Sequence, residues 1–208
     1  MSKNLLLPTN FEKAVQRFFE KHKNSLLDVI LFGSYVRGKS RPADIDILLL
    51  FKEKKDIMLT QQFRHSCPFP HLELEVIPKT YDELLSSDFL AREGILSEGY
   101  SIVKKEYISK LFNFSPLVLF RYDLKKLNKS KRMLFYYSLY GRKKGESGML
   151  GTLQATKLTD STLWVPVAKS EEAKTYLASW HIDFMEIPLL IPQRIVQSEK
   201  FRQQNRKD

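Results

Sequence analysis

Residues 31–51 have the sequence "LFGSYVRGKSRPADIDILLLF", in which two aspartates, Asp44 and Asp46, begin an otherwise apolar run. Side chains two positions apart in a β-strand point to the same face, so these carboxylates are expected together, with Cα atoms roughly 6.5 Å apart. Such a pair repels itself and loses solvation unless a cation lies between the two groups. Because Mg²⁺ commonly binds to one or two carboxylates together with phosphate oxygens, the pair predicts a divalent metal site.

A glycine–serine pair, Gly33-Ser34, lies between the preceding apolar run and the two aspartates. Glycine permits a tight turn, and the N–H groups and hydroxyl of such a turn form a typical site for phosphate. Most such turns are only turns, but beside a predicted metal site the pair indicates phosphate binding. Arg37 in the same loop suits either a phosphate contact or a salt bridge to a nearby carboxylate.

The first half of the chain alternates predicted helices and strands. Apolar residues at helical spacing predict helices, and short apolar runs bounded by turn residues predict strands. In chain order these are a helix at 9–22, strands at 26–32 and 44–51, a helix at 55–66, a strand at 71–77, and a mostly helical stretch at 80–103 with a closing strand near Tyr100–Val103. This alternation predicts an α/β (α+β) fold with one mixed sheet flanked by helices.

The spacing of the motif resembles that of a known family. Gly-Ser, nine further residues and then Asp-Ile-Asp, placed across consecutive predicted strands, resemble the motif of the DNA polymerase β-like nucleotidyltransferase superfamily. The longer pattern "GSYVRGKSRPADIDILL" is most similar to the small prokaryotic members, the minimal nucleotidyltransferases. The match is specific over residues 31–51, and the order of elements extends it to about residue 103.

The resemblance implies a metal-dependent transferase that moves a nucleoside monophosphate from an NTP to a hydroxyl, with pyrophosphate as the leaving group. Gly33 and Ser34 would hold the β- and γ-phosphates, with Arg37 as a further candidate ligand. Asp44 and Asp46 would bind two Mg²⁺ ions, and Mn²⁺ is an alternative metal. A third carboxylate from the neighbouring strand would bind the catalytic metal and help to deprotonate the acceptor hydroxyl.

The third carboxylate has two candidates in "LELEVI", Glu73 and Glu75, which share one face of the predicted strand. Glu75 lies in the hydrophobic frame that the family usually shows and is the first choice. Glu73 is expected to be a neighbouring or solvated group. The family more often has aspartate here, whose side chain is one methylene shorter, and Ala43 replaces the frequent serine before the first aspartate.

The composition is that of a globular protein, with 43% hydrophobic and 28% charged residues. The single Cys67 excludes an internal disulfide, and four scattered histidines argue against a zinc site. No apolar run approaches the roughly 20 residues of a membrane-spanning helix, and the first ten residues do not resemble a signal peptide. We therefore expect a cytoplasmic protein with no membrane partner.

The net charge of +10 lies entirely in the second half, since residues 1–103 hold 14 basic and 14 acidic residues whereas residues 104–208 hold 20 and 10. This imbalance indicates a polyanionic partner for the second half. The predicted organisation is a nucleotidyltransferase domain at 1–104, a basic α+β domain at 105–195 that binds the acceptor, and a flexible tail at 196–208. Elements predicted in the basic domain are helices at 130–141 and 170–180 and strands at 162–167 and 182–192.

Residues 121–144 are dense in cations with tyrosines and phenylalanine between them. Cations neutralise phosphates and aromatic rings stack on unpaired bases, so this stretch predicts contact with RNA. The candidate RNA-binding residues are Lys125, Lys126, Lys129, Lys131, Arg132, Arg142, Lys143 and Lys144.

Three functions are therefore considered from the sequence. The first is a Mg²⁺-dependent, NTP-using nucleotidyltransferase with an RNA acceptor. The second is a nucleic-acid-binding protein on a transferase fold that has lost catalysis. The third is a protein-adenylylating member of the antitoxin type, against which the long basic second half argues.

Overall fold

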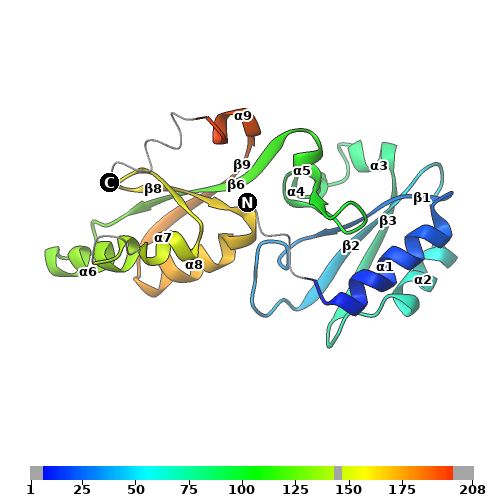
Figure 1. Cartoon of the computed structure of the whole chain (residues 1–208), viewed down its shortest axis with the longest axis horizontal. Helices are drawn as coiled ribbons and strands as arrows, with labels where there is room; N and C mark the ends of the chain where they lie inside the picture. Colours follow the sequence, from blue (N-terminus) through cyan, green and yellow to red (C-terminus); the bar gives the residue numbers. More distant parts are fainter. Residues whose placement is uncertain (1–6, 143–146, 199–208) are drawn as a thin grey trace. The chain divides into compact units, whose positions relative to one another are not determined.

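The structure is a computed structural model that describes residues 7–142 and 147–198 (Figure 1). Contacts between Cα atoms divide the chain into two compact units, Met1–Phe112 and Asn113–Asp208. The first unit therefore extends past residue 104, where the sequence places the boundary. The reason is Ile108, which packs into the core of the first unit. Residues 199–208 of the expected flexible tail lie outside the described residues.

The first unit is built on a five-stranded sheet with the order β3-β2-β1-β4-β5. Its strands are β1 (Leu26–Phe32), β2 (Asp44–Phe51), β3 (Glu73–Thr80), β4 (Tyr100–Ser101) and β5 (Glu106–Tyr107), and its helices are α1 (Thr9–His22), α2 (Ile57–Ser66), α3 (Tyr81–Leu85), α4 (Arg92–Glu98) and α5 (Ile108–Leu111). β2 pairs antiparallel with β1 and parallel with β3, so the predicted mixed sheet is confirmed. β3 begins at Glu73 rather than at the predicted residue 71, because His71 has a φ of +61° and cannot continue a strand.

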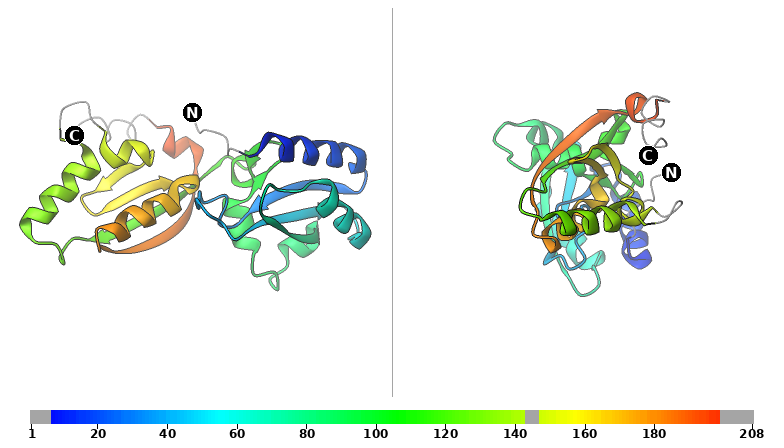
Figure 2. Two further views of the ribbon diagram at one scale, coloured as in Figure 1. Left: turned by 90° about the horizontal axis from the view of Figure 1, so that it is seen from below. Right: turned by 90° about the vertical axis from the view of Figure 1, so that its left-hand side faces the viewer.

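Helices cover both faces of this sheet, with α1 on one side and α3 and α4 on the other (Figure 2, left). On the α1 side, Phe11, Val15 and Phe18 are buried at the helical spacing that predicts the helix. The Phe18 ring meets the Phe63 ring of α2 edge to face at a centroid distance of 5.1 Å.

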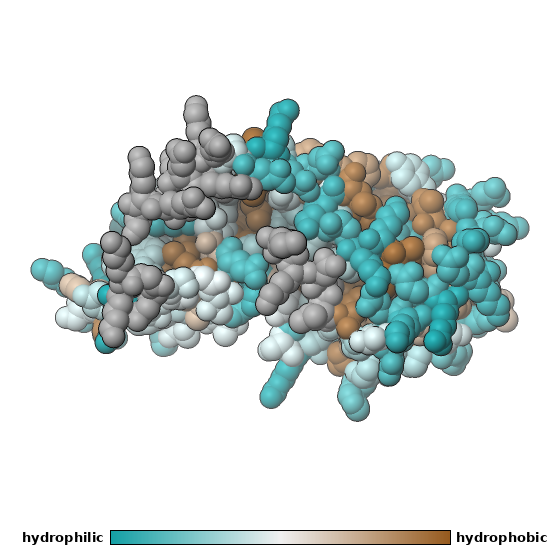
Figure 3. Space-filling model, in the orientation of Figure 1, coloured by the Kyte–Doolittle hydropathy of each residue, from teal (hydrophilic) through white to brown (hydrophobic). Residues whose placement is uncertain are grey.

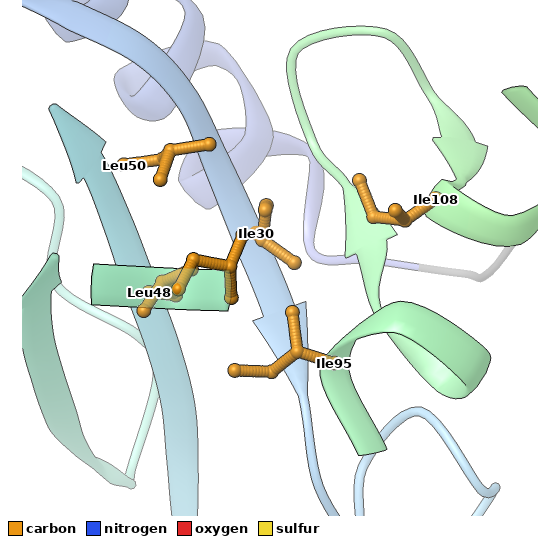
Figure 4. Close-up of a cluster of buried hydrophobic side chains, with 6 residues drawn as sticks. Ile30, Leu48, Leu50, Ile95 and Ile108 are labelled. Atoms are coloured by element: carbon orange, nitrogen blue, oxygen red, sulfur yellow. The ribbon is translucent and has the colours of Figure 1, made fainter. Parts of the chain in front are cut away.

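The opposite face carries a compact apolar cluster (Figure 4). It joins the two central strands to the helices that follow β3, through the buried residues Ile30, Leu48, Leu50, Leu84, Ile95 and Ile108. Burying one such side chain stabilises the fold by about 1.5–3 kcal/mol. Because Leu48 and Leu50 are fixed in this cluster, the residues at positions 44 and 46 of the same strand point to the same face of the sheet.

The second unit is built on a four-stranded antiparallel sheet with the order β7-β8-β6-β9. Its elements are β6 (Phe114–Asp123), α6 (Lys129–Tyr140), α7 (Gly148–Thr152), β7 (Thr156–Thr159), β8 (Thr162–Pro166), the 3-10 helix η1 (Val167–Lys169), α8 (Ser170–Ser179), β9 (Asp183–Pro192) and α9 (Gln193–Val196). The succession β6-α6-β7-β8-α8-β9 with this strand order is the ferredoxin-like split βαβ arrangement. The expected α+β fold is therefore confirmed, although such a topology does not by itself specify a function.

The helices α6 and α8 lie on the same side of the second sheet (Figure 1). Phe135 of α6 is fully buried and meets the rings of Tyr122, Tyr176 and Trp180 at centroid distances of 5.6 to 5.8 Å. α6 begins at its N-cap Asn128, whose side chain accepts a hydrogen bond from the Lys131 N–H.

In the second unit, β6 and the short β7 were not predicted from the sequence, although β6 lies between β8 and β9. Pro116 argues against a central strand, since proline has no N–H to donate. In the structure Pro116 pairs only with β9, and the pairing with β8 starts at Leu117. Proline is therefore tolerated because the strand is still an edge on that side at this position.

None of the described helices is long and apolar enough to span a membrane. On the face of the first unit that Figure 3 shows, apolar residues form separate patches among hydrophilic ones.

Candidate active site

The backbone after β1 passes directly against the carboxylate of Asp46. Gly33 has a φ of +76°, and a Cβ atom placed on it would lie 2.0 Å from Oδ2 of Asp46. Both the left-handed conformation and the close approach require glycine. The glycine predicted from the sequence thus brings backbone and carboxylate together.

The turn that follows is closed by its own hydrogen bonds. The Gly38 N–H donates to the Tyr35 carbonyl at 3.0 Å, and the Lys39 N–H donates to the Ser34 carbonyl at 3.1 Å. Val36 is completely buried and anchors the turn to the core. The turn therefore holds Ser34, which is partly exposed, at a fixed place at the end of β1.

Four carboxylates lie on one face of neighbouring strands. Asp44 and Asp46 are partly exposed, whereas Ile45 between them is completely buried on the other face. In the parallel pairing of β2 with β3, Glu73 lies opposite Asp44 and Glu75 lies opposite Asp46. Both glutamates are exposed on the edge strand β3.

The electrostatics of the site centre on Asp46. Burial raises the pKa of the Asp46 carboxyl above its ordinary value, and the negative charges of Asp44 and Glu75 raise this pKa further. The positive charge of Arg37 acts in the opposite direction. Glu75 lies opposite Asp46 in the pairing of β2 with β3, and its charge contributes to the raised pKa of Asp46. A cation at this place would relieve the repulsion among the three groups.

In the described part of the chain, no three His, Cys, Asp or Glu side chains are placed to hold a metal ion together. Asp44 and Asp46 are neighbouring carboxylates on one face of β2, and Glu75 lies opposite Asp46 on β3. This donor set fits Mg²⁺, because that ion takes one or two protein carboxylates and completes its shell with substrate phosphate oxygens and water. There is no room for a side chain at position 33, because its Cβ atom would clash with the Asp46 carboxylate.

Arg37 forms a salt bridge to a nearby carboxylate, which is one of the two roles that the sequence suggests for it. Its Nη1 atom lies 3.0 Å from Oε2 of Glu98, the last residue of α4. Glu98 is a buried charged residue that the sequence does not mark as part of the site, since 61 positions separate the two partners. Its sequence signal is only a glutamate just before Gly99 at the end of a predicted helical stretch.

Comparison with protein families gives one match in the first unit. Residues 13–106 match the family described as polymerase beta, nucleotidyltransferase. The first unit is a polymerase beta-type nucleotidyltransferase domain. The resemblance of residues 31–51 to this superfamily is therefore confirmed, and the matched stretch includes β1, β2 and β3.

Comparison with solved structures gives low overall similarity. A crystal structure of a mutant of the toxin–antitoxin MntA–HpeT shares 18% identity, covers 44% of this chain and 70% of that chain, and has a TM-score of 0.33. A crystal structure of a toxin–antitoxin with AMP-PNP shares 20% identity, covers 44% of this chain and 71% of that chain, and has the same TM-score of 0.33. No curated protein matches the chain.

Outside the nucleotidyltransferase domain, three of the predicted RNA-binding cations make contacts within the second unit itself. Nζ of Lys126 lies 2.7 Å from Oδ2 of Asp183, and Lys125 pairs with its near neighbour in sequence, Asp123, at 3.2 Å. Nε of Arg132 donates to the carbonyls of residues 124 and 127 at 3.0 and 2.8 Å. The three cations therefore have partners within the second unit, although the two lysine pairs are largely exposed to solvent.

The other predicted RNA-binding residues differ in their surroundings. Lys129 and Lys131 are exposed in the first turn of α6 and form no ion pair with a described residue. The guanidinium of Arg142 lies over the Tyr137 ring, 5.6 Å from its centroid. Lys143 and Lys144 lie outside the described residues.

Proposed function

We propose that this protein transfers a nucleoside monophosphate from an NTP to a hydroxyl acceptor, using Mg²⁺ or Mn²⁺ held by Asp44 and Asp46. The observation that carries the proposal is the contact of the Gly33 backbone with Asp46, beside Asp44 on the same face of β2. This contact joins a turn suited to phosphate with a pair of carboxylates suited to a metal. The matched family supports the same reaction class.

The roles of the residues follow from their positions. Gly33 and Ser34 offer the backbone and hydroxyl groups of the closed turn to the β- and γ-phosphates. A metal ion at the two aspartates would neutralise phosphate charge and favour displacement of pyrophosphate. Glu75, next to Asp46 on β3, is exposed and would accept the proton of the acceptor hydroxyl.

We further propose that the acceptor is RNA and that the second unit binds it. The excess of ten basic residues after position 103 supports this, as do the exposed Lys129 and Lys131. Charge neutralisation of this kind gives binding that weakens steeply as salt rises. The engaged cations Lys125, Lys126 and Arg132 contribute less to this proposal.

The test of the reaction is incorporation of each radiolabelled NTP into total RNA in the presence of Mg²⁺. The double variant Asp44→Asn/Asp46→Asn should lose at least about a thousandfold in rate, because loss of the metal removes several kcal/mol of charge stabilisation. Its thermal stability in metal-free buffer should be equal or higher, since the like-charge repulsion is also removed. Incorporation at the wild-type rate by this variant would contradict the proposal.

A second candidate is a nucleic-acid-binding protein on a domain that no longer catalyses transfer. It is favoured by one observation, the lack of a three-ligand metal group in the described residues. The two functions differ in their response to ligand. Mg²⁺ with an NTP should raise the melting temperature of an enzyme, whereas only RNA should raise that of the second candidate.

The third function, protein adenylylation by an antitoxin-type member, requires a partner protein as acceptor. The two similar solved structures are described as toxin–antitoxin complexes, and that description applies to those proteins. In the assay above, label incorporated into a co-purified protein and not into RNA would select this function.

A further inference from the structure

The ion pair between Arg37 and Glu98 connects the turn after β1 to the end of α4. Nη1 of Arg37 lies 3.0 Å from Oε2 of Glu98, and the two side chains are 32% and 11% exposed. A charge-assisted hydrogen bond that is largely shielded from water is stronger than the ion pairs on the surface of a protein. The pair therefore fixes the direction of the Arg37 side chain.

The fixed guanidinium acts on the carboxylates of the site. Arg37 follows Gly33 in the same closed turn, and Gly33 lies against Asp46. The hydrogen bonds from Gly38 to Tyr35 and from Lys39 to Ser34 enclose Arg37 in this turn. A phosphate bound at the turn would therefore lie near the Arg37 side chain, and guanidinium groups bind phosphate oxygens in a fixed geometry.

Glu98 is itself held rigidly by its neighbours. Ile95, one turn earlier in α4, is completely buried in the apolar cluster. A Cβ atom on Gly99 would lie 2.3 Å from the Ile95 carbonyl oxygen and 3.0 Å from Cγ2 of Ile30, so the chain after Glu98 is pressed onto β1. From there Tyr100 pairs directly with Leu31. The carboxylate of Glu98 therefore starts from a fixed part of the fold.

We propose that Glu98 is a positioning residue, which holds Arg37 beside Asp46 so that the guanidinium meets the phosphates of the bound nucleotide. This inference rests on the proposed function, because it takes a nucleoside triphosphate as the ligand of the turn. An ion pair with a purely structural role would change stability alone. A positioning role instead links Glu98 to nucleotide binding through Arg37.

The test is a double-mutant cycle on the full chain with Glu98→Gln, Arg37→Ala and the two together. Glutamine keeps the size of the side chain and removes its charge. Glu98→Gln should raise the KM for the NTP about tenfold, with a smaller change in kcat, and should add nothing in the Arg37→Ala background. The matched control is Glu93→Gln, an exposed glutamate of the same helix, which should leave both constants unchanged.

Thermal unfolding of each variant separates folding from binding. If Glu98→Gln unfolds, Glu98→Asp takes its place. This variant keeps the negative charge but moves it one methylene away from Arg37, so it should fold and still raise the KM for the NTP. An unchanged or lowered KM in the folded variant would overturn the inference, as would an equal effect of Glu98→Gln with and without Arg37. If the wild type neither binds nor uses an NTP, the proposed function fails instead.

Discussion

The two units differ in where they place charged and polar side chains. The first unit buries Asp28 and Glu98 at 3% and 8% exposure, and partly buries Asp46. In the described part of the second unit, Ser170 is the buried polar residue, and the interior is aromatic and aliphatic. A buried charge costs stability unless it is paired, so natural folds retain such groups mainly where they serve a purpose.

Each buried carboxylate of the first unit has its partners. Asp28 accepts hydrogen bonds from the Val29 N–H at 2.8 Å and from the Ser101 hydroxyl at 2.7 Å. Nζ of Lys104 lies 3.6 Å from its other oxygen. The ion pairs of the second unit are more exposed than Asp28: Lys126 and Asp183 are 66% and 65% exposed, and Lys174 and Glu171 are 27% and 23% exposed. Net charge and buried charge therefore lie in different units. The second unit has the larger net charge, whereas the first unit contains the buried carboxylates, whose burial costs stability.

Among the substitutions that test this difference between the units, Gly33→Ala is expected to have the largest effect. Gly33→Ala should destabilise the first unit by about 1–3 kcal/mol, because a positive φ and a clash with Asp46 are both forced on the backbone. Nucleotide affinity should fall by about tenfold or more. Thermal unfolding and nucleotide titration measure the two effects.

The control for this variant is Gly94→Ala in α4. A Cβ atom there would have no neighbour within 4 Å, so alanine should be neutral or slightly stabilising. Equal behaviour of the two alanine variants would show that the close approach at Gly33 has no importance.

An intermediate effect is expected at Arg132 in the second unit. Arg132→Ala should lower the unfolding free energy by about 1–2 kcal/mol, because it leaves the carbonyls of residues 124 and 127 without their charged donor. Lys131→Ala, on the same helix, should leave stability unchanged but weaken RNA binding and reduce its dependence on salt. If Arg132→Ala weakened RNA binding without any loss of stability, Arg132 would serve RNA binding and its hydrogen bonds to the two carbonyls would not stabilise the fold.

The smallest effect is expected from the pH dependence of Asp28. Burial raises the pKa of this carboxyl in the folded chain, against the effect of its hydrogen bonds and of Lys104. A raised pKa means that the ionised form disfavours folding, so this cost is present at neutral pH and is relieved as the pH falls through the folded pKa. Asp28→Asn should therefore gain stability relative to the wild type at pH 7 and lose that gain in acid, as measured by thermal unfolding across this range. If the difference in stability between Asp28→Asn and the wild type did not change with pH, burial would not disfavour the ionised form of Asp28.

The sequence predicted the architecture of the first unit because its signals are local. The turn at Gly33, the partly exposed Asp44 and Asp46, and the buried apolar run that follows them lie within 21 positions of the sequence. Glu98 could not be assigned in this way, since its partner Arg37 is 61 positions away and the link exists only once β4 pairs with β1.

In the second unit the local signals were weaker and in part misleading. Pro116 argued against a strand that is paired on both sides over half of its length, and β7, with four residues, is too short to show a period. The basic stretch predicted RNA contacts from charge alone. Whether a lysine or arginine has an acidic partner depends on residues such as Asp183, which the fold brings close to Lys126 from a distant part of the chain.

The position of β4 in the first sheet has a consequence for how the protein is made. β1 acquires β2 as a neighbour within a few tens of residues, but its other edge stays open until Tyr100 and Ser101 leave the ribosome. During synthesis Asp44, Asp46 and the turn that precedes them would exist for some time without Glu98 to anchor Arg37. Synthesis at about 5–20 residues per second makes this interval several seconds long, during which the open edge of β1 can pair with a strand of another chain.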